Sequence, residues 1–120
     1  MYSYTVACTF EDEATALAWV LWLTEEHLAD VLSAGALGAH VLRMDGEAMR
    51  YEVRYAFASR ADFQAYEQDH AARLRAEGLA RFPLERGLRY ERSTGEVVAR
   101  RVATGPRIAD DTADTQEPAP

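Results

Sequence analysis

The sequence contains no lysine, one cysteine, few prolines and no long apolar run. The single cysteine, Cys8, excludes an internal disulfide and any zinc site built from several cysteines. The longest apolar run, Leu17 to Leu23, is far too short to cross a bilayer. No basic segment precedes an apolar stretch at the N-terminus, so we expect a cytoplasmic protein.

The chain carries a net acidic charge. Thirteen basic residues, all arginine, face 20 acidic residues, which gives a net charge of −7. Residues 1–102 carry 12 Arg against 16 acids, and residues 103–120 carry one Arg against four acids. An acidic surface without a basic stripe disfavours nucleic acid and anionic membranes, because both bind proteins largely through Lys and Arg. We therefore expect neither as a partner.

The length and composition predict one folded domain and a tail. Residues 1–95 have the patterned apolar residues of a globular domain. A turn at residues 93–95 would lead into a possible extra strand over residues 96–102. From Thr104 onward, small, polar and acidic residues with three prolines cannot build a core, so residues 103–120 are predicted to be a disordered acidic tail.

The first half of the domain predicts a strand, a helix and a hairpin. Residues 2–10 alternate between apolar and polar side chains, as in a half-buried strand. Asp12 is the expected N-cap of a helix that ends near Gly35. The apolar stripe of this helix is predicted to consist of Leu17, Val20, Leu21, Leu28, Val31 and Leu32.

A hairpin is predicted around Asp45-Gly46, because such a pair between alternating runs favours a tight turn. Its strands would be residues 37–44 and 49–57. A two-residue turn would place Leu42 opposite Met49 and His40 opposite Tyr51.

The second half predicts another helix and strand. Ser59 is the expected N-cap, with Asp62 completing a capping box, and Gly78 is the expected C-terminal residue. The stripe of this helix would consist of Phe63, Tyr66, His70 and Leu74, and a strand would follow over residues 84–92. The order β-α-β-β-α-β predicts an α+β, ferredoxin-like fold, an antiparallel sheet with both helices on one face.

Histidines and tyrosines are the candidate functional residues. His70 and Tyr66 would face the sheet as catalytic groups, and His40, Tyr51 and Tyr55 would share that layer. Imidazoles and phenols can transfer protons or hold a small aromatic or oxyanionic ligand. The same residues are also consistent with a hydrogen-bonded core that has no site.

Three further features complete the candidates. Trp19 and Trp22 fall outside the predicted stripe of the first helix, and His27 lies near the edge of that stripe. We expect the tryptophan face to meet a ligand, a partner or the C-terminal segment, or else to be partly buried by neighbouring loops. Arg50, Glu52 and Arg54 would form either an anion site or a self-satisfied network of charges. No metal-ligand spacing is present.

The chain resembles a bacterial family of unknown function that is grouped with the dimeric α/β-barrel proteins. The resemblance covers about residues 2–92, and its most specific part is the Trp-x-x-Trp…Glu-His segment. The matching residues are Trp19, Trp22, Leu23, Glu26, His27, Leu28, Asp30, Val31, Gly35, Tyr51, Val53, Tyr55, Tyr66, His70, Ala71, Leu74, Arg75 and Phe82. The chain departs from the pattern at Ala29, where proline is expected.

The resemblance implies a homodimer in which two sheets pack face to face. The wider superfamily includes cofactor-free monooxygenases, haem-degrading oxygenases, isomerases and ligand-sensing domains, and a shared fold does not choose among them. One hypothesis is therefore a small-molecule pocket between helices and sheet, as in a cofactor-independent oxygenase or isomerase. The other is a non-catalytic dimeric module for ligand sensing or protein interaction. No cofactor is predicted; a haem-binding variant of the first hypothesis would use His70 as axial ligand.

Overall fold

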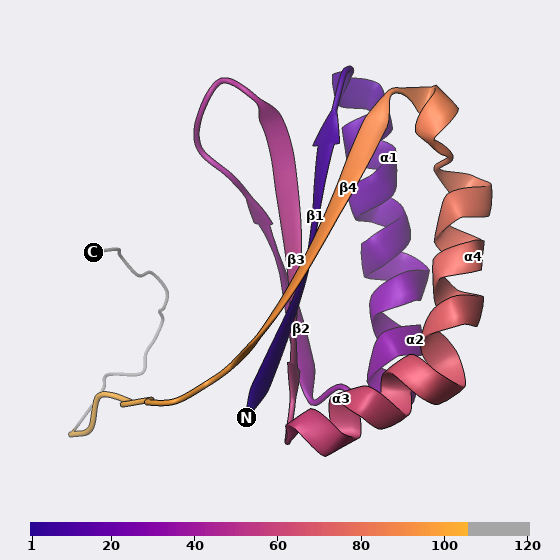
Figure 1. Ribbon diagram of the computed structural model, residues 1–120. Coiled ribbons are helices and arrows are strands. Elements are labelled where there is room, and N and C mark those ends of the chain that lie inside the picture. The colour runs from indigo at the N-terminus through magenta and orange to yellow at the C-terminus, as the bar shows by residue number, and fades with distance from the viewer. Residues whose placement is uncertain (106–120) are drawn as a thin grey trace.

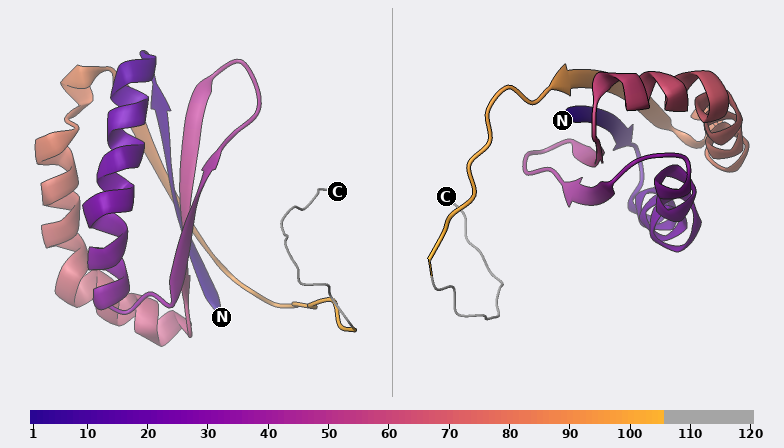
Figure 2. Two further views of the ribbon diagram at one scale, coloured as in Figure 1. Left: turned by 180° about the vertical axis from the view of Figure 1, so that it is seen from behind. Right: turned by 90° about the horizontal axis from the view of Figure 1, so that it is seen from below.

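A computed structural model describes residues 1–105 as an antiparallel four-stranded sheet with helices on one face (Figures 1 and 2). The strands lie in the order β2-β3-β1-β4, which confirms the ferredoxin-like prediction. The elements are β1 (Tyr2–Phe10), α1 (Glu13–Trp22), a π-helical turn (Leu23–His27), α2 (Leu28–Ser33), β2 (Gly38–Arg43), β3 (Met49–Phe57), α3 (Arg60–Tyr66), a second π-helical turn (Glu67–Ala71), α4 (Ala72–Arg81), a 3₁₀ turn (Leu84–Arg86) and β4 (Leu88–Glu96). Within this part of the chain, no helix combines the length and apolar character needed to cross a membrane.

β1 is one of the two central strands of the sheet, with β3 on one side and β4 on the other. Tyr4, Cys8 and Phe10 are buried on the face that the helices cover. Both neighbours pair with β1 along its whole length, so that Tyr2 lies opposite Phe57 on one side and Glu96 on the other. The tyrosine-rich face of β1 thus forms the floor of the core.

The last strand differs from the prediction at both ends. Gly87, with a φ of 82°, ends the 3₁₀ turn in the left-handed region, and β4 begins only at Leu88. β4 then continues through residues 93–95 to Glu96, because β1 offers backbone partners along that whole stretch. The predicted turn and the extra strand over residues 96–102 are therefore wrong, and residues 97–105 have no regular structure. Of the predicted tail, residues 106–120 lie outside the described residues.

The hairpin is present, but its predicted register is wrong. His40 lies opposite Arg54 rather than Tyr51, and Val41 lies opposite Val53. The connection is longer than two residues, since the Met44 amide donates to the Arg50 carbonyl at 2.9 Å. Compared with the prediction, the pairing of β2 with β3 is shifted by an odd number of residues. Each side chain of β2 therefore lies on the opposite face of the sheet from the one predicted. Val41 therefore faces the helices, and His40 lies on the open face.

The first helix buries a different face from the predicted one. Trp19, Trp22 and Leu23 are buried, whereas Leu17 and Leu21 are more than half exposed. Apolar side chains surround this helix from residue 16 to residue 23, so their spacing alone does not select a face. Burying the two indoles removes the most apolar area from water, and this decides the orientation.

The second helix contains a π-helical turn that changes its phase. Phe63 and Tyr66 are buried as predicted, but the next buried position is Ala71, five residues after Tyr66. An α-helix would place the next inward position at three or four residues. The prediction that His70 faces the sheet is therefore wrong. Gly78 is also not the end of the helix, because α4 continues to Arg81.

Both helices do begin where the sequence predicts. The Asp12 carboxylate accepts from the Thr15 amide at 2.8 Å, and the Ser59 hydroxyl accepts from the Asp62 amide at 3.1 Å. These caps satisfy amides that lack intrahelical partners. The helix starts thus fix how the two helices enter the layer above the sheet.

Candidate functional site

A small cavity lies between the sheet and the helices. It has a volume of about 40 Å³ and opens at one side to solvent. The walls are largely apolar and aromatic, and several polar groups converge on the interior, as is typical of small-molecule sites. The lining residues are Tyr4, Val6, Trp19, Trp22, Leu23, His27, Val53, Tyr55, Tyr66, Leu74, Arg75, Gly78, Leu79, Tyr90 and Arg92.

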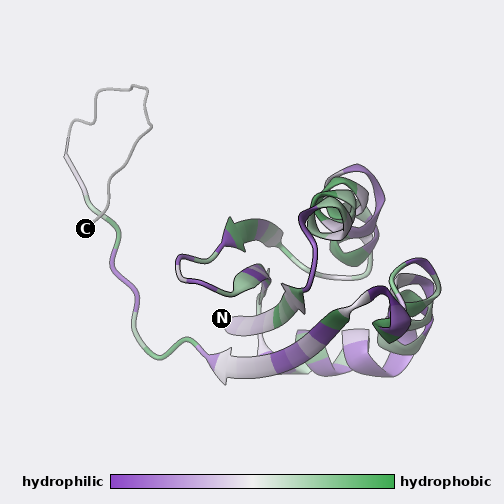
Figure 3. Ribbon diagram, turned by 90° about the horizontal axis from the view of Figure 1, so that it is seen from above, coloured by the Kyte–Doolittle hydropathy of each residue, from purple (hydrophilic) through white to green (hydrophobic). Residues whose placement is uncertain are grey.

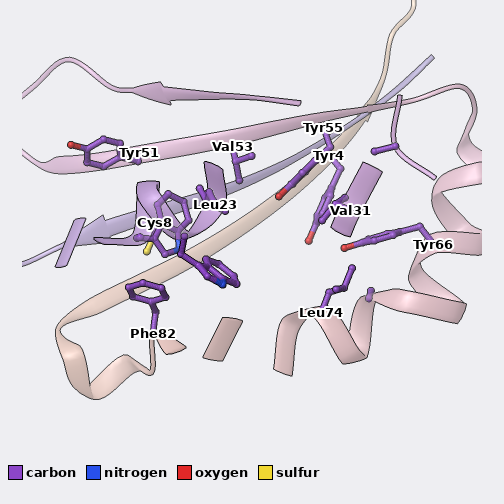
Figure 4. Packing of buried hydrophobic residues seen from close by; sticks show 14 of the residues in the cluster. Tyr4, Cys8, Leu23, Val31, Tyr51, Val53, Tyr55, Tyr66, Leu74 and Phe82 are labelled. Atoms are coloured by element: carbon purple, nitrogen blue, oxygen red, sulfur yellow. The ribbon is translucent and has the colours of Figure 1, made fainter. Parts of the chain in front are cut away.

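Three tyrosine hydroxyls point into the same space (Figure 4). Tyr4 and Tyr55 lie opposite each other on β1 and β3, with stacked rings whose centroids are 5.7 Å apart. Tyr66 approaches from α3, and its ring centroid lies 6.2 Å from that of Tyr4. Burial raises the pKa of Tyr66 to about 12 and the pKa of Tyr55 further still. Both phenols therefore remain protonated and can donate hydrogen bonds.

Arg75 places a positive charge beside the tyrosine hydroxyls of the cavity. Its Nη2 donates to the Tyr4 hydroxyl at 3.2 Å and to the Glu67 carboxylate at 2.5 Å. Since Tyr4 accepts from Arg75, the hydroxyl proton of Tyr4 is free to donate elsewhere. The buried Nε of Arg75 has no hydrogen-bond partner among residues 1–105. An unpaired buried donor is costly, so this atom is a natural contact for a ligand oxygen.

His27 and Trp22 form a stacked pair at the cavity, with ring centroids 4.4 Å apart. A Cβ on Gly78 would lie 3.3 Å from the far edge of the Trp22 indole, so the missing side chain of Gly78 allows this close approach. Burial lowers the pKa of His27, which favours the neutral imidazole. Its buried Nδ1 has no partner among residues 1–105. The cavity therefore contains a neutral histidine with free hydrogen-bonding capacity.

The structure brings together four of the predicted site residues: Trp22, His27, Tyr55 and Tyr66 all line the cavity. Trp22 does so as a buried wall, not as part of an exposed face. The other three candidates lie elsewhere.

Each of these three has a separate reason. Tyr51 is buried but packs edge-on against Phe10, away from the cavity lining. His40 is exposed on the open face because of the hairpin register. His70 is partly exposed beside Arg73, whose Nη2 lies 3.0 Å from Nδ1 of the histidine, because the π-helical turn rotates it out of line.

Tyr4 and Arg75 are the important residues that the sequence did not single out. The alternation of β1 placed Tyr4 on the helix face, but no short turn joins β1 to β3, so its partner Tyr55 could not be identified. Arg75 follows a buried leucine on an otherwise charged helix, and such an arginine usually points to solvent. The signal that could have found Arg75 is its position nine residues after Tyr66. This spacing brings the two residues to the same side of the helix only because the π-helical turn between them contains an extra residue.

Haem does not fit these residues. His70, the expected axial ligand, does not line the cavity. The cavity volume of about 40 Å³ is enough for only about three water molecules. Among residues 1–105, no group of three or more His, Cys, Asp or Glu side chains is placed to hold a metal ion.

The open face of the sheet has a separate, polar character. Glu52 accepts from the guanidinium groups of Arg54 at 2.9 Å and Arg50 at 3.3 Å, and Arg50 also donates to Glu91 at 2.9 Å. The two arginines hold the pKa of Glu52 below its usual range. Of the two predicted alternatives, the structure shows the self-satisfied network of charges.

The chain belongs to a family described as Domain of unknown function (DUF4286), whose model matches residues 1–88. The resemblance to a family of unknown function is confirmed to that extent. No curated protein matches the chain.

Solved structures with the same fold cover most of the chain. A dimeric ferredoxin-like protein from an uncultured marine organism has a TM-score of 0.65 and 15% identity, over 86% of this chain and 100% of its own. A variant of SnoaB, a cofactor-independent oxygenase from Streptomyces nogalater, has a TM-score of 0.58 and 11% identity, over 82% and 95%. A variant of MhuD with two manganese protoporphyrin IX molecules per active site has a TM-score of 0.58 and 18% identity, over 84% and 99%. At these identities the likeness establishes the fold alone.

Proposed function

We propose that the protein binds a small aromatic acid or phenolate in the cavity between the helices and the sheet. The observation that carries this proposal is the convergence of three tyrosine hydroxyls and the Arg75 guanidinium inside apolar walls. Phenol donors and a permanently charged guanidinium together suit an ionised oxygen. The surrounding indoles and aliphatic side chains suit an aromatic ring.

The size of the cavity restricts the ligand to about one ring. A benzene-sized molecule needs more than the existing 40 Å³. Leu79, which is 45% exposed, and the exposed Arg92 stand at the rim and can rotate without disturbing the core. Binding then includes a small opening between α4 and β4.

The same residues support chemistry that begins with a proton transfer. His27 is the histidine of the cavity and takes the role first expected of His70. A neutral imidazole can accept a proton from a ligand, while Tyr66 and Arg75 stabilise the oxyanion that forms. Such a first step is compatible with an isomerase and with a cofactor-independent oxygenase. One protein with the same fold, SnoaB, is described as a cofactor-independent oxygenase.

We further propose that the chain is a homodimer, with the open faces of two sheets in contact. Among the described residues, helices cover one face of the sheet and leave the other open (Figure 1). The open face contains a hollow of about 770 Å³ between the side chains of its strands. One fold neighbour is a dimeric ferredoxin-like protein. The ordered Arg50–Glu52–Arg54 network would then meet its own copy.

The alternative function is a non-catalytic dimeric module for ligand sensing or protein interaction. The hydrogen bonds from Arg75 Nη2 to Tyr4 and Glu67 favour it, because an arginine held in this way can bind a ligand without reacting. Ligand turnover separates the two: a bound aromatic acid that is recovered unchanged after prolonged incubation in air indicates the module.

Intrinsic tryptophan fluorescence tests the binding proposal. Both tryptophans of the chain, Trp19 and Trp22, line the cavity, so a ligand there must change their emission. A titration with 4-hydroxybenzoate should change the emission saturably, and the neutral amide should bind at least tenfold more weakly. Arg75→Gln should weaken 4-hydroxybenzoate binding by about tenfold or more, the size of one charge-assisted hydrogen bond.

Arg73→Gln is the matched control, since Arg73 lies on the same helix and contacts His70 outside the cavity. It should bind as the native chain does. Equal losses in both variants, or no saturable change with any single-ring acid or phenol, would refute the proposal.

A further inference from the structure

Two buried side-chain atoms of residues 1–105 have no hydrogen-bond partner: Nε of Arg75 and Nδ1 of His27. A packed core pairs its buried polar atoms, because an unpaired one costs free energy. Both atoms belong to residues that line the same small cavity between the helices and the sheet. Two such exceptions in one place indicate that the ligand of this cavity carries two polar groups of its own.

The atom on Arg75 needs an acceptor. Its Nε carries a hydrogen and can only donate, and the guanidinium is permanently charged, so an ionised oxygen suits it best. The Tyr4 hydroxyl accepts from Nη2 of the same guanidinium at 3.2 Å and keeps its own proton. An oxygen at Nε therefore has a second donor close by, and this end of the cavity suits a carboxylate.

The atom on His27 has a different requirement. Burial lowers the pKa of this histidine and outweighs the nearby Asp30 carboxylate, so the imidazole is neutral at pH 7. In a neutral imidazole, Nδ1 donates in one tautomer and accepts in the other. A hydroxyl can do both, so it pairs with Nδ1 in either tautomer. This end of the cavity suits a hydroxyl.

An aromatic wall links the two ends. Arg75 lies on α4, and three residues further Gly78 lies against the edge of the Trp22 indole, to which an added Cβ would approach within 3.3 Å. His27, from the first π-helical turn, stacks on the same indole. Figure 3 shows hydrophobic residues in both helices and in the strands beneath them. A ligand that reaches both atoms therefore needs a flat, apolar body between its polar groups.

We propose that the ligand is an aromatic hydroxy acid held in one orientation, with its carboxylate at Arg75 Nε and its hydroxyl at His27 Nδ1. This inference rests on the proposed function and names the ligand class of the same cavity. A hydroxyl placed away from the carboxylate, as in 3- and 4-hydroxybenzoate, can reach His27. The hydroxyl of 2-hydroxybenzoate bonds its own carboxylate and stays at the Arg75 end, and benzoate has no hydroxyl.

Calorimetric titration of the full chain with these four acids tests the two contacts. In the native chain, 3- or 4-hydroxybenzoate should bind about fivefold more tightly than benzoate, the size of one neutral hydrogen bond, and 2-hydroxybenzoate should gain nothing. His27→Phe keeps a ring beside Trp22 and removes both nitrogens, so it should abolish this preference. His70→Phe is the same change outside the cavity and should retain it.

The outcomes separate this inference from the proposed function. Equal affinities for all four acids, each weakened by Arg75→Gln, overturn the contact with His27 and leave the proposed function. A preference that persists in His27→Phe also overturns it, since the hydroxyl then has another partner. If none of the four acids binds, this inference fails, and the proposed function fails with it when phenols do not bind either.

The ¹⁵N signal of His27 Nδ1 gives a second test, which needs no folded variant at that position. The chain has three histidines, so His40→Gln and His70→Ala assign the remaining imidazole. The tighter-binding hydroxybenzoate should shift the Nδ1 signal saturably, and benzoate at saturation should shift it much less, because only the former places a hydroxyl there. Equal shifts with both acids would contradict the proposed orientation.

Discussion

The two faces of the sheet are built from the same strands but differ in chemical character. On the helix face, β1 and β3 present tyrosines, valines and Phe57, and nearly all are buried. On the open face, the intervening residues of the same strands present hydroxyls and the Arg50–Glu52–Arg54 network. Alternation along a strand separates the two sets by one residue. Ligand chemistry and partner chemistry can therefore be changed independently in one short sequence.

The largest expected effect comes from truncating one side chain on each face and comparing the loss of unfolding free energy. Phe57 is completely buried and packs against Phe63 and Tyr66, with ring centroids at 5.3 and 5.4 Å. Phe57→Ala should lower the free energy of unfolding by about 3–5 kcal/mol in a urea titration. Thr5→Ala, on the open face of β1, should change it by less than about 0.5 kcal/mol. Similar losses at both positions would contradict the division of faces.

A smaller effect is expected within the charged network. Glu52→Gln removes the carboxylate that both Arg54 and Arg50 contact, and the side chain of Glu52 is 12% exposed. The cost should be about 1 kcal/mol of unfolding free energy, measured at pH 7. The lowered pKa of Glu52 means that its contribution is present above pH 4.5 and is lost as the pH falls below that value. The native and variant chains should therefore converge in stability at acid pH.

His27 should make the helix side pH-dependent in the same direction. Its pKa is lowered by burial, so the folded state binds a proton less readily than the unfolded chain. Stability from this group is complete above the ordinary value of 6.5 and is lost as the pH falls below it. His27→Phe should reduce the decline between pH 7.5 and 5.5. His40→Gln, on the exposed edge strand, should retain it.

The smallest effect is expected at His70. This residue is partly exposed and contacts only Arg73 among the hydrogen bonds of residues 1–105. His70→Ala should change the free energy of unfolding by less than about 0.5 kcal/mol and leave the binding of 4-hydroxybenzoate unchanged. A loss of binding in this variant, without a loss of stability, would restore His70 to the site and contradict the phase of α4.

Sequence reasoning predicted the element order, the two helix caps and the faces of β1 and β3, because strand alternation and capping are local. It failed where the structure depends on an extra residue within a helix or a loop, or on which of several apolar side chains is buried. One extra residue in the second π-helical turn, Glu67–Ala71, rotated His70 outward and Ala71 inward, and nothing in local propensity marks such a turn. The longer hairpin loop moved His40 to the other face. In the first helix, Trp19 and Trp22 are buried in the core in place of Leu17 and Leu21.

The side-chain NMR signal of Arg75 tests the central claim most directly. Its Nε is buried without a hydrogen-bond partner in the described part of the chain, residues 1–105, whereas the Nε atoms of Arg50 and Arg54 both donate to Glu52. In a ¹H–¹⁵N spectrum of the arginine Nε region, with Arg75 assigned from the missing peak of Arg75→Gln, 4-hydroxybenzoate should shift the Arg75 signal saturably. The Arg50 and Arg54 signals should stay in place. A shift confined to Arg50 and Arg54 would move the ligand to the open face and contradict the account.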